Sequence, residues 1–358
     1  TKLNVKSAKL NGVECTVKKG KVSQNNNNNN NNQNNNKKTT EKDVKKLLKR
    51  TSKAKQGDDW LHTDGSKILD KDGKEVWLTG VNWFGYNTGT NTFDGLWNSE
   101  LVSSVEAIAD HGFNLIRVPI SAELINQWSE GEYPKANYNN AYNEELNSMN
   151  SLEIFDYFLK LAEENGLKVM PDIHSAETNA SGHTVNLWYT DKVTVKDYYH
   201  ALEWLADRYK DNDTIIAFDL KNEPHGKRGY NGSECPDTIA KWDDSTDLNN
   251  WKYSAEQCAN SILAVNPNAL ILVEGVEQYP KTEQGYTYDT PDIWDAPADK
   301  SPWYPAWWGG NLRGVKDNPV VPESGTSQIV YSPHDYGKSV YNQTWFQKDF
   351  TTQTLLDD

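Results

Sequence analysis

The sequence has no long apolar run and only three cysteines. No stretch approaches the ~18 consecutive apolar residues of a membrane-spanning helix, so we expect no membrane insertion. The cysteines, Cys15, Cys235 and Cys258, include no CxxC pair and no zinc-ligand spacing. Cys235 and Cys258 could form one disulfide in an exported protein, although an odd cysteine count does not decide this. The sequence therefore favours neither a membrane protein nor a zinc module.

The sequence also lacks an initiator methionine and the features of a signal peptide. It begins at Thr1, without the charged and apolar regions that a signal peptide shows. We therefore interpret the chain as an excised piece of a larger modular protein.

Positive charge is scarce outside the first 57 residues. The chain has 37 Lys and Arg against 51 Asp and Glu, a net charge of −14. Residues 1–57 hold 15 basic and 3 acidic residues, a local charge of +12 that leaves −26 for the remainder. Because such an acidic body repels phosphate backbones, we expect no nucleic-acid partner. The basic stretch alone could contact polyanions, but a solvated linker is the better interpretation.

Tryptophan is unusually frequent, with 14 residues beside 18 tyrosines. Tryptophan is rarely buried completely and usually keeps one edge in contact with water. Some of these side chains must serve the core, but so many in an acidic chain also suggest a flat-walled apolar cleft. Sugar rings are the usual flat, uncharged ligands of such a cleft.

Three regions are predicted along the chain. Residues 1–23 alternate apolar and polar side chains around Asn11-Gly12, which is a strong hairpin signal. Because a lone hairpin is marginal in water, we interpret it as the C-terminal remnant of an upstream β-rich domain. Residues 24–57 are Asn/Gln-rich and then Lys-rich, have no apolar face, and are predicted to be a linker. The globular domain is expected over residues 58–358.

Short apolar runs and amphipathic stretches alternate within residues 58–358. The predicted strands are Glu75–Phe84, Asn114–Pro119, Lys168–Ile173, Thr214–Leu220, Ala269–Glu274 and Gln328–Ser332. Four stretches with helical spacing lie between them, beginning near Leu101, Leu152, Thr194 and Trp251. Apolar strands that alternate with amphipathic helices predict an α/β fold with a parallel, helix-covered sheet.

Polar and aromatic residues recur where these strands end. They are Asn82-Trp83, Arg117, His174, Asn222-Glu223, Glu274 and His334. A site built from many strand ends is typical of a (β/α)8 TIM barrel. An open doubly wound sheet is less well supported, because the first predicted strand is not followed by a glycine-rich phosphate loop. Since we count six of the eight strands, the expected barrel is incomplete.

The segment from Asp219 to Pro224, DLKNEP, is the key motif. A carboxylic acid at the mouth of a barrel strand can protonate a leaving group, and the preceding amide can bond a substrate hydroxyl. Glu223 and Asn222 are placed for these two roles. An isolated NEP motif is a surface glutamate at a strand end about as often as it is a catalytic one. The functional interpretation therefore depends on whether the other strand ends also carry suitable residues.

Four further residues lie at the ends of the predicted strands. Arg117 places a guanidinium there, either for the site or for a structural ion pair. His174 could bond a sugar hydroxyl or merely cap its strand, and His334 and Tyr336 could position a carboxylate and a sugar. Taken singly, none of these residues decides between function and structure.

Eight segments together resemble a known family. They are GVNWFGYNT, GFNLIRVPI, VMPDIH, LWYT, IAFDLKNEPHG, VNPNALILVEGV, WWGGNL and IVYSPHDYG. In order and spacing over residues 58–358, they resemble the endoglucanase (cellulase) branch of family 5 glycoside hydrolases. The Asn-Glu pair is shared by a wider clan of barrel glycosidases and alone would not name a substrate.

The resemblance implies roles for individual residues. Glu223 matches the general acid/base, and Asn222 matches the residue that bonds the sugar 2-hydroxyl. Arg117 and His174 match residues around the nucleophile and the −1 sugar, and His334 and Tyr336 match the strand-six pair, whose tyrosine normally bonds the nucleophile. The sugar-stacking candidates are Trp83, Trp188, Trp307 and Trp308.

One departure concerns the second carboxylate. In the family the nucleophile is a glutamate that ends strand seven, and we expect this chain to stop before that strand. Glu274, at the end of strand five, is adjacent to strand four, but the resemblance assigns the nucleophile elsewhere. We therefore interpret Glu274 as a polar residue of the barrel rim.

These observations predict a secreted, retaining endo-β-1,4-glucanase that hydrolyses cellulose or β-glucan, although the fragment alone is expected to be inactive. A mannanase or xylanase on the same barrel and a non-catalytic glycan-binding protein are the alternatives. No organic cofactor is expected. No metal is expected either, because the acidic loop with Asp289, Asp292, Asp295 and Asp299 is better explained as solvated than as a calcium site.

Overall fold

The computed structural model describes residues 59–228, 238–292, 300–346 and 350–353, together with the backbone of three short strands nearer the start. The chain divides into two compact units, Thr1–Lys38 and Thr39–Asp358. The predicted linker over residues 24–57 lies outside the described residues, except for Gln24. Cys235 also lies outside them, and Cys258 is a buried free thiol.

The first unit contains an antiparallel sheet in the order β1-β2-β3. Its strands are β1 (Ser7–Leu10), β2 (Val13–Lys18) and β3 (Lys21–Gln24). Strands β1 and β2 pair antiparallel, with Leu10 opposite Val13. The predicted hairpin is confirmed, and β3 adds a strand that the sequence analysis did not predict. Its origin in a larger upstream domain stays a prediction.

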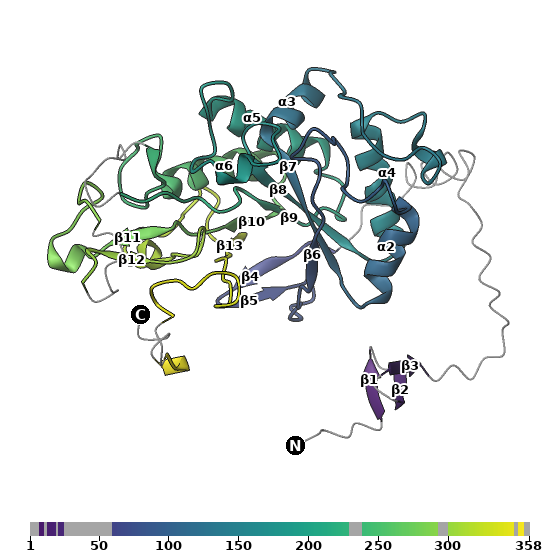
Figure 1. Cartoon of the computed structure of the whole chain (residues 1–358), viewed down its shortest axis with the longest axis horizontal. Coiled ribbons are helices and arrows are strands. Elements are labelled where there is room, and N and C mark those ends of the chain that lie inside the picture. Colours follow the sequence, from purple (N-terminus) through teal and green to yellow (C-terminus); the bar gives the residue numbers. More distant parts are fainter. Residues whose placement is uncertain are drawn as a thin grey trace. The chain divides into compact units, whose positions relative to one another are not determined.

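The second unit is built on a six-stranded parallel sheet (Figure 1). Its strands are β6 (Gly80–Asn82), β7 (Leu115–Ser121), β8 (Lys168–Ser175), β9 (Ala217–Asp219), β10 (Leu270–Val273) and β13 (Ile329–Tyr331). The spatial order β13-β10-β9-β8-β7-β6 follows the chain without reversal. A doubly wound sheet reverses its order at a switch point, whereas a barrel does not. The predicted α/β fold is confirmed, with six strands of barrel type among the described residues.

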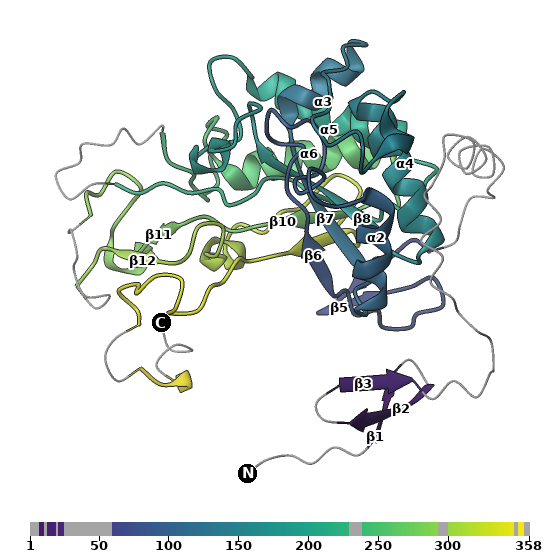
Figure 2. The ribbon, with the colours of Figure 1, turned by 45° about the vertical axis from the view of Figure 1, so that its right-hand side comes forward.

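Among the described residues, five α-helices connect these strands. They are α2 (Leu101–Asp110), α3 (Ala122–Ser129), α4 (Ser151–Glu164), α5 (Val195–Arg208) and α6 (Trp251–Val265). Figures 1 and 2 show them along one side of the curved sheet. The sequence analysis predicted four, including the α5 capping box in which Thr194 and Asp197 bond each other's backbone N–H. It missed α3, because the helix starts directly after β7, with Ser121 as the last strand residue and the N-cap.

The first predicted strand, Glu75–Phe84, is much shorter in the structure. Within this range only Gly80–Asn82 forms a strand of the six-stranded sheet. Glu75, at the start of the range, instead forms an antiparallel bridge with Leu69, which belongs to a separate hairpin. This unpredicted hairpin consists of β4 (His62–Asp64) and β5 (Lys67–Leu69). Trp77, just before β6, is 78% exposed.

A long excursion separates β10 from β13. It contains the antiparallel pair β11 (Gln278–Pro280) and β12 (Trp303–Pro305), at the left of Figure 1. Single 3-10 turns lie at Glu144–Leu146, Gly182–Thr184, Thr282–Gln284 and Arg313–Lys316. No helix in the described part of the chain is long and apolar enough to span a membrane.

Many of the aromatic residues pack in the core between sheet and helices. Trp128, Trp188, Trp242 and Trp251 belong to this core, and Trp303, on β12, is also fully buried. Burying an aromatic side chain removes a large apolar area from water, so these residues stabilise the fold. Part of the tryptophan surplus therefore has a structural explanation rather than a carbohydrate-binding one.

Candidate active site

Arg117, near the middle of β7, is the centre of a buried ion-pair cluster. Its guanidinium nitrogens lie 3.0 Å from Asp172, 2.8 Å from Asp219 and 3.2 Å from Glu274. Its Nη2 also donates to Asn222 Oδ1 at 3.1 Å. A planar fork of five N–H donors suits several acceptors at once, which the single ammonium of a lysine does not. The sequence left open whether Arg117 forms a structural ion pair or belongs to the site. In the structure it does both: it pairs with buried carboxylates and it bonds Asn222.

His174 is fixed by a neighbour on its own strand. Asp172 and His174 are two residues apart on β8, so their side chains point to the same face. Asp172 Oδ2 lies 2.6 Å from His174 Nδ1. Burial raises the pKa of Asp172, but Arg117 and His174 outweigh burial and lower it, so this carboxylate accepts the Nδ1–H of the imidazole.

Glu223 receives hydrogen bonds from three sides. Its Oε1 accepts the Tyr336 hydroxyl at 2.8 Å and lies 3.0 Å from His334 Nδ1, while Asn222 Nδ2 donates to Oε2 at 3.4 Å. Its own backbone N–H donates to Glu274 Oε2 at 2.7 Å. Burial raises the pKa of Glu223, but the bonds from His334 and Tyr336 lower it to about 2. In the structure, Tyr336 thus bonds Glu223, whereas the resemblance implied a bond to a nucleophile.

Glu274 is not the rim residue that the sequence analysis expected. It is fully buried, and both of its oxygens are occupied. Oε2 accepts the Glu223 N–H, and Oε1 lies 2.9 Å from His334 Nε2 and 3.2 Å from Arg117 Nη2. Burial, with Asp219 nearby, raises the pKa of Glu274 to about 8. The expectation was wrong because a strand-end position does not reveal how deeply a later loop buries it.

Asp219, Glu274 and His334 bring three possible ligand atoms within 4.8 Å of one another. Arg117 already bonds both of these carboxylates. A bound cation would therefore meet the fixed positive charge of the guanidinium, and this cluster does not fit a metal ion.

The four candidate stacking tryptophans have different surroundings. Trp188 is fully buried against Trp251, with ring centroids 4.9 Å apart, so its prediction as a sugar-stacking residue is wrong. Trp83 is half-buried, packs on Phe93 at 4.3 Å and donates its indole N–H to the Asp94 carbonyl, as a packing residue does.

Trp307 and Trp308 are both half-buried. Trp308 stacks on His225 with centroids 3.8 Å apart and planes inclined by 3°, so one of its faces is covered. Trp307 meets the edge of Tyr336 at 5.3 Å. Since Tyr336 bonds Glu223, the structure brings Trp307 to within one side chain of the candidate acid.

Three contributors to the site escaped sequence reasoning. Asp172 and Asp219 pair with Arg117 but stand inside apolar strands, where only their charge distinguished them. Gly309, from the β10–β13 excursion, covers the back of the site: a Cβ there would lie 2.2 Å from Glu274 Oε2 and 3.0 Å from Glu223 Cα. The Trp-Trp-Gly-Gly sequence was the available signal, but it had been interpreted only for its tryptophans.

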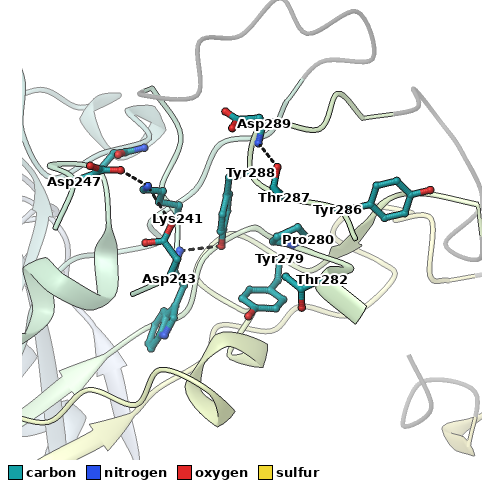
Figure 3. A pocket seen from close by; sticks show the side chains of 12 residues that line it. Lys241, Asp243, Asp247, Tyr279, Pro280, Thr282, Tyr286, Thr287, Tyr288 and Asp289 are labelled. Atoms are coloured by element: carbon teal, nitrogen blue, oxygen red, sulfur yellow. Dashed lines mark hydrogen bonds and ion pairs between the residues drawn. The ribbon is translucent and has the colours of Figure 1, made fainter. Parts of the chain in front are cut away.

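A cavity of about 380 Å³ lies elsewhere in the unit, beside β11 (Figure 3). Lys241 pairs there with both Asp243 and Asp247, and the Tyr288 hydroxyl accepts the Trp242 N–H. Figure 3 shows the Tyr286 ring at the margin, turned away from the other labelled side chains. Because none of the predicted site residues lines this cavity, we do not take it as the active site.

Comparison with protein families assigns the chain. Residues 69–358 match the model of the cellulase family, glycosyl hydrolase family 5. The chain belongs to glycosyl hydrolase family 5. The resemblance noted from the eight sequence segments is confirmed, as is the assignment to the glycoside hydrolases.

Individual relatives agree with this assignment. Endoglucanase G of Acetivibrio thermocellus is 57% identical over 84% of this chain and 56% of its own length. Endoglucanase B of the same organism is 46% identical over 84% of this chain and 52% of its own. The chain thus spans about half the length of these curated relatives. An endocellulase from Pyrococcus horikoshii, solved with cellotetraose, has a TM-score of 0.67 and 31% identity, over 82% of this chain and 73% of that one.

The charges of this family 5 site predict how stability depends on pH. His334 loses affinity for its proton through burial, but its bonds to Glu223 and Glu274 raise its pKa from 6.5 to about 10. A raised histidine pKa contributes stability that is complete below about pH 6.5 and disappears as the pH rises towards 10. The raised pKa of Glu274 acts in the same direction, between about pH 4.5 and 8. We therefore expect the melting temperature to fall between pH 6.5 and 10.

Melting curves of wild type, His334→Gln and His111→Gln test this expectation. His111 is an exposed histidine at the end of α2 and serves as the control. The fall in melting temperature between pH 6.5 and 10 should be smaller in His334→Gln and unchanged in His111→Gln. Equal slopes in all three proteins would show that His334 does not carry this dependence.

Proposed function

We propose that the protein containing this chain is a secreted, modular endo-β-1,4-glucanase that hydrolyses cellulose or β-glucan. The observation that carries the proposal is Glu223, held among Asn222, His334 and Tyr336 at the strand ends of a family 5 barrel. The names of the endoglucanase and endocellulase relatives support the substrate class. A major extracellular endoglucanase of Xanthomonas campestris supports secretion.

In the proposed retaining mechanism Glu223 first protonates the leaving oxygen and then, as a base, activates water. The surroundings of Glu223 suit the second step, because Tyr336 and His334 favour its ionised form. For the first step Glu223 must hold a proton. A nucleophile carboxylate that took over the Tyr336 hydroxyl would remove one of these bonds and add a negative charge, and both changes raise the pKa of Glu223.

The nucleophile is proposed to lie outside the described residues. A retaining enzyme needs two carboxyl groups about 5–5.5 Å apart with substrate access. Glu274 does not qualify, because its oxygens bond Glu223, Arg117 and His334 and Gly309 covers it. These contacts support the exclusion of Glu274 as the nucleophile.

A substrate panel tests the proposed function. Purified full-length protein should release reducing sugar from carboxymethylcellulose and barley β-glucan, with a rapid fall in viscosity that marks internal cleavage. Preferential release from mannan or xylan would assign one of the alternative activities. Binding of cello-oligosaccharides without cleavage of any polymer would instead favour a non-catalytic glycan-binding protein.

Trp307 and Trp308 are the proposed sugar-stacking residues. Replacing the stacking residue by alanine should weaken binding of cellotetraose by about 1–3 kcal/mol, by analogy with other stacking on aromatic side chains. We expect the larger effect for Trp307, because a face of Trp308 is already covered by His225. Titration calorimetry of Trp307→Ala, Trp308→Ala and the control Trp77→Ala measures this. If both site variants bind as tightly as Trp77→Ala, these tryptophans are packing residues.

A further inference from the structure

Glu274 is linked to Glu223 in two ways: directly to its backbone, and through the His334 ring to its side chain. Directly, Oε2 accepts the Glu223 backbone N–H at 2.7 Å. Indirectly, Oε1 lies 2.9 Å from His334 Nε2, and the Nδ1 of the same ring lies 3.0 Å from Glu223 Oε1. One buried carboxyl group therefore determines where the Glu223 backbone turns and which atom supports its carboxylate.

The hydrogen bond from the Glu223 N–H to Glu274 offsets the cost of an unfavourable backbone conformation at Glu223. Glu223 has a φ of +52°, in the left-handed region that residues other than glycine rarely adopt. Such a conformation is strained for a residue with a side chain and persists only where the surroundings enforce it. The Glu274 carboxyl is completely buried, so no water competes for the oxygen that accepts the Glu223 N–H. The bond from Glu223 N–H to Glu274 is the contact that can hold this turn.

The side-chain contact depends on where one proton lies. An ionised Glu223 only accepts hydrogen bonds, so His334 must carry a hydrogen on Nδ1. A single proton between His334 Nε2 and Glu274 Oε1 satisfies the other contact, whichever atom holds it. In both arrangements the His334–Glu274 pair has the same net charge and Nδ1–H still points at Glu223. Glu274 thus fixes the ring without altering the charge that Glu223 meets.

The surroundings leave Glu274 little freedom to move. Gly309 N and O bond Pro224 O and Gly275 N, and the absence of a Cβ at Gly309 lets the loop lie against Glu274. Titratable and charged groups face Glu274 from β7, β9, the segment after β9 and the segment after β13: Arg117, Asp219, Lys221, Glu223, His334 and Tyr336, with Asp172 joined through Arg117.

We propose that Glu274 is a positioning residue that holds Glu223 in its left-handed turn and directs His334 Nδ1–H at the Glu223 carboxylate. The catalytic part of this statement rests on the proposed function, whereas the effect on the state of Glu223 does not. Glu274 touches no substrate atom in this account. It acts only through Glu223 and His334.

Glu274→Gln in the full-length protein tests the proposal. The amide keeps one acceptor oxygen and turns an NH₂ group towards either the Glu223 N–H or the His334–Arg117 side, so one contact must break. We expect kcat on β-glucan to fall about 100-fold, as for a ~1 Å misplacement at an active site, with KM changed less than about threefold. The ¹³C-detected titration midpoint of Glu223 should rise by about one pH unit or more as the His334 bond weakens.

Glu256→Gln is the matched control. Glu256 lies on α6, likewise accepts a backbone N–H, from Val321 at 3.0 Å, and pairs with a cation, Lys252 at 2.8 Å. It should leave kcat and the Glu223 titration unchanged. Equal kcat and equal Glu223 midpoints in Glu274→Gln and Glu256→Gln would overturn the proposal.

The test still decides the proposal if wild type is inactive or if Glu274→Gln does not fold. If wild type cleaves no β-glucan, the proposed function fails, but the Glu223 titration still decides whether Glu274 positions it. If Glu274→Gln does not fold, Gly309→Ala and Gly285→Ala replace it. Both glycines have positive φ, +71° and +84°, but only a Cβ at Gly309 meets Glu274. A shifted Glu223 midpoint in Gly309→Ala alone supports the proposal, and unshifted midpoints in both contradict it.

Discussion

Glu223→Ala in the full-length protein should slow the cleavage of β-glucan by about 10²–10⁴-fold, the range for a general acid–base group. The expectation follows from the position of Glu223 after Asn222, where it is bonded by Tyr336 and His334. Removing the carboxyl leaves no described residue that could take over its proton transfer, since Glu274 is enclosed. Initial rates of reducing-sugar release from barley β-glucan measure the effect.

Azide provides a second measurement on the same variant. A small anion that fits the space left by the Glu223 side chain should partly restore turnover on substrates with an activated leaving group. Glu256→Ala, a change of the same chemistry on α6, should retain wild-type rates. Near-normal activity of Glu223→Ala on β-glucan would contradict the assignment of Glu223.

Arg117→Ala should destabilise the protein more than any other single change discussed here. Asp172, Asp219 and Glu274 are all buried, and each contacts the guanidinium. Breaking one buried ion pair costs about 3–5 kcal/mol because the remaining charge is left unpaired. Loss of these contacts at Asp172 and Asp219, with Glu274 losing its hydrogen bond from the guanidinium, is therefore comparable to the whole stability of a typical domain, about 5–15 kcal/mol. We expect insoluble or largely unfolded protein at neutral pH.

Arg117→Lys should recover only part of this loss, because one ammonium group does not replace a fork with three partners. Lowering the pH should reduce the difference in unfolding free energy between these variants and wild type, since protonation of the buried carboxylates removes their unpaired charges. Urea unfolding of these variants, with Arg208→Ala as the control, measures the difference. Arg208 pairs with Asp156 at a partly exposed site, where a loss of about 0–1 kcal/mol is expected. A loss in Arg117→Ala no larger than in Arg208→Ala would contradict the account.

The strand ends were predictable from the sequence, and so was most of the chemistry that they carry. Apolar runs fixed the strand positions closely, and the residue after each run falls at the same edge of a parallel sheet. Asn222 and Glu223 were identified in this way. Arg117 was also assigned to a strand end, but it lies within β7, and its long side chain still reaches Asn222. His334 and Tyr336 follow β13 and also reach Glu223.

What failed depends on contacts between segments far apart in the chain. Glu274 was misjudged because its burial is completed by Gly309, 35 residues later, after the excursion through β11 and β12. Trp188 was misassigned because its partner, Trp251, stands on α6. Local patterns show which residues lie at a strand end, but they do not show which loop returns to cover them.

The dependence on leaving group tests the central claim most directly. A general acid matters most when the leaving oxygen is basic and least when it departs readily without a proton. The account predicts that Glu223→Ala cleaves 2,4-dinitrophenyl β-cellobioside at a rate near that of wild type for the first chemical step, whereas cleavage of cellotetraose falls by about 10²-fold or more. An equal loss on both substrates would contradict the claim that Glu223 donates the proton.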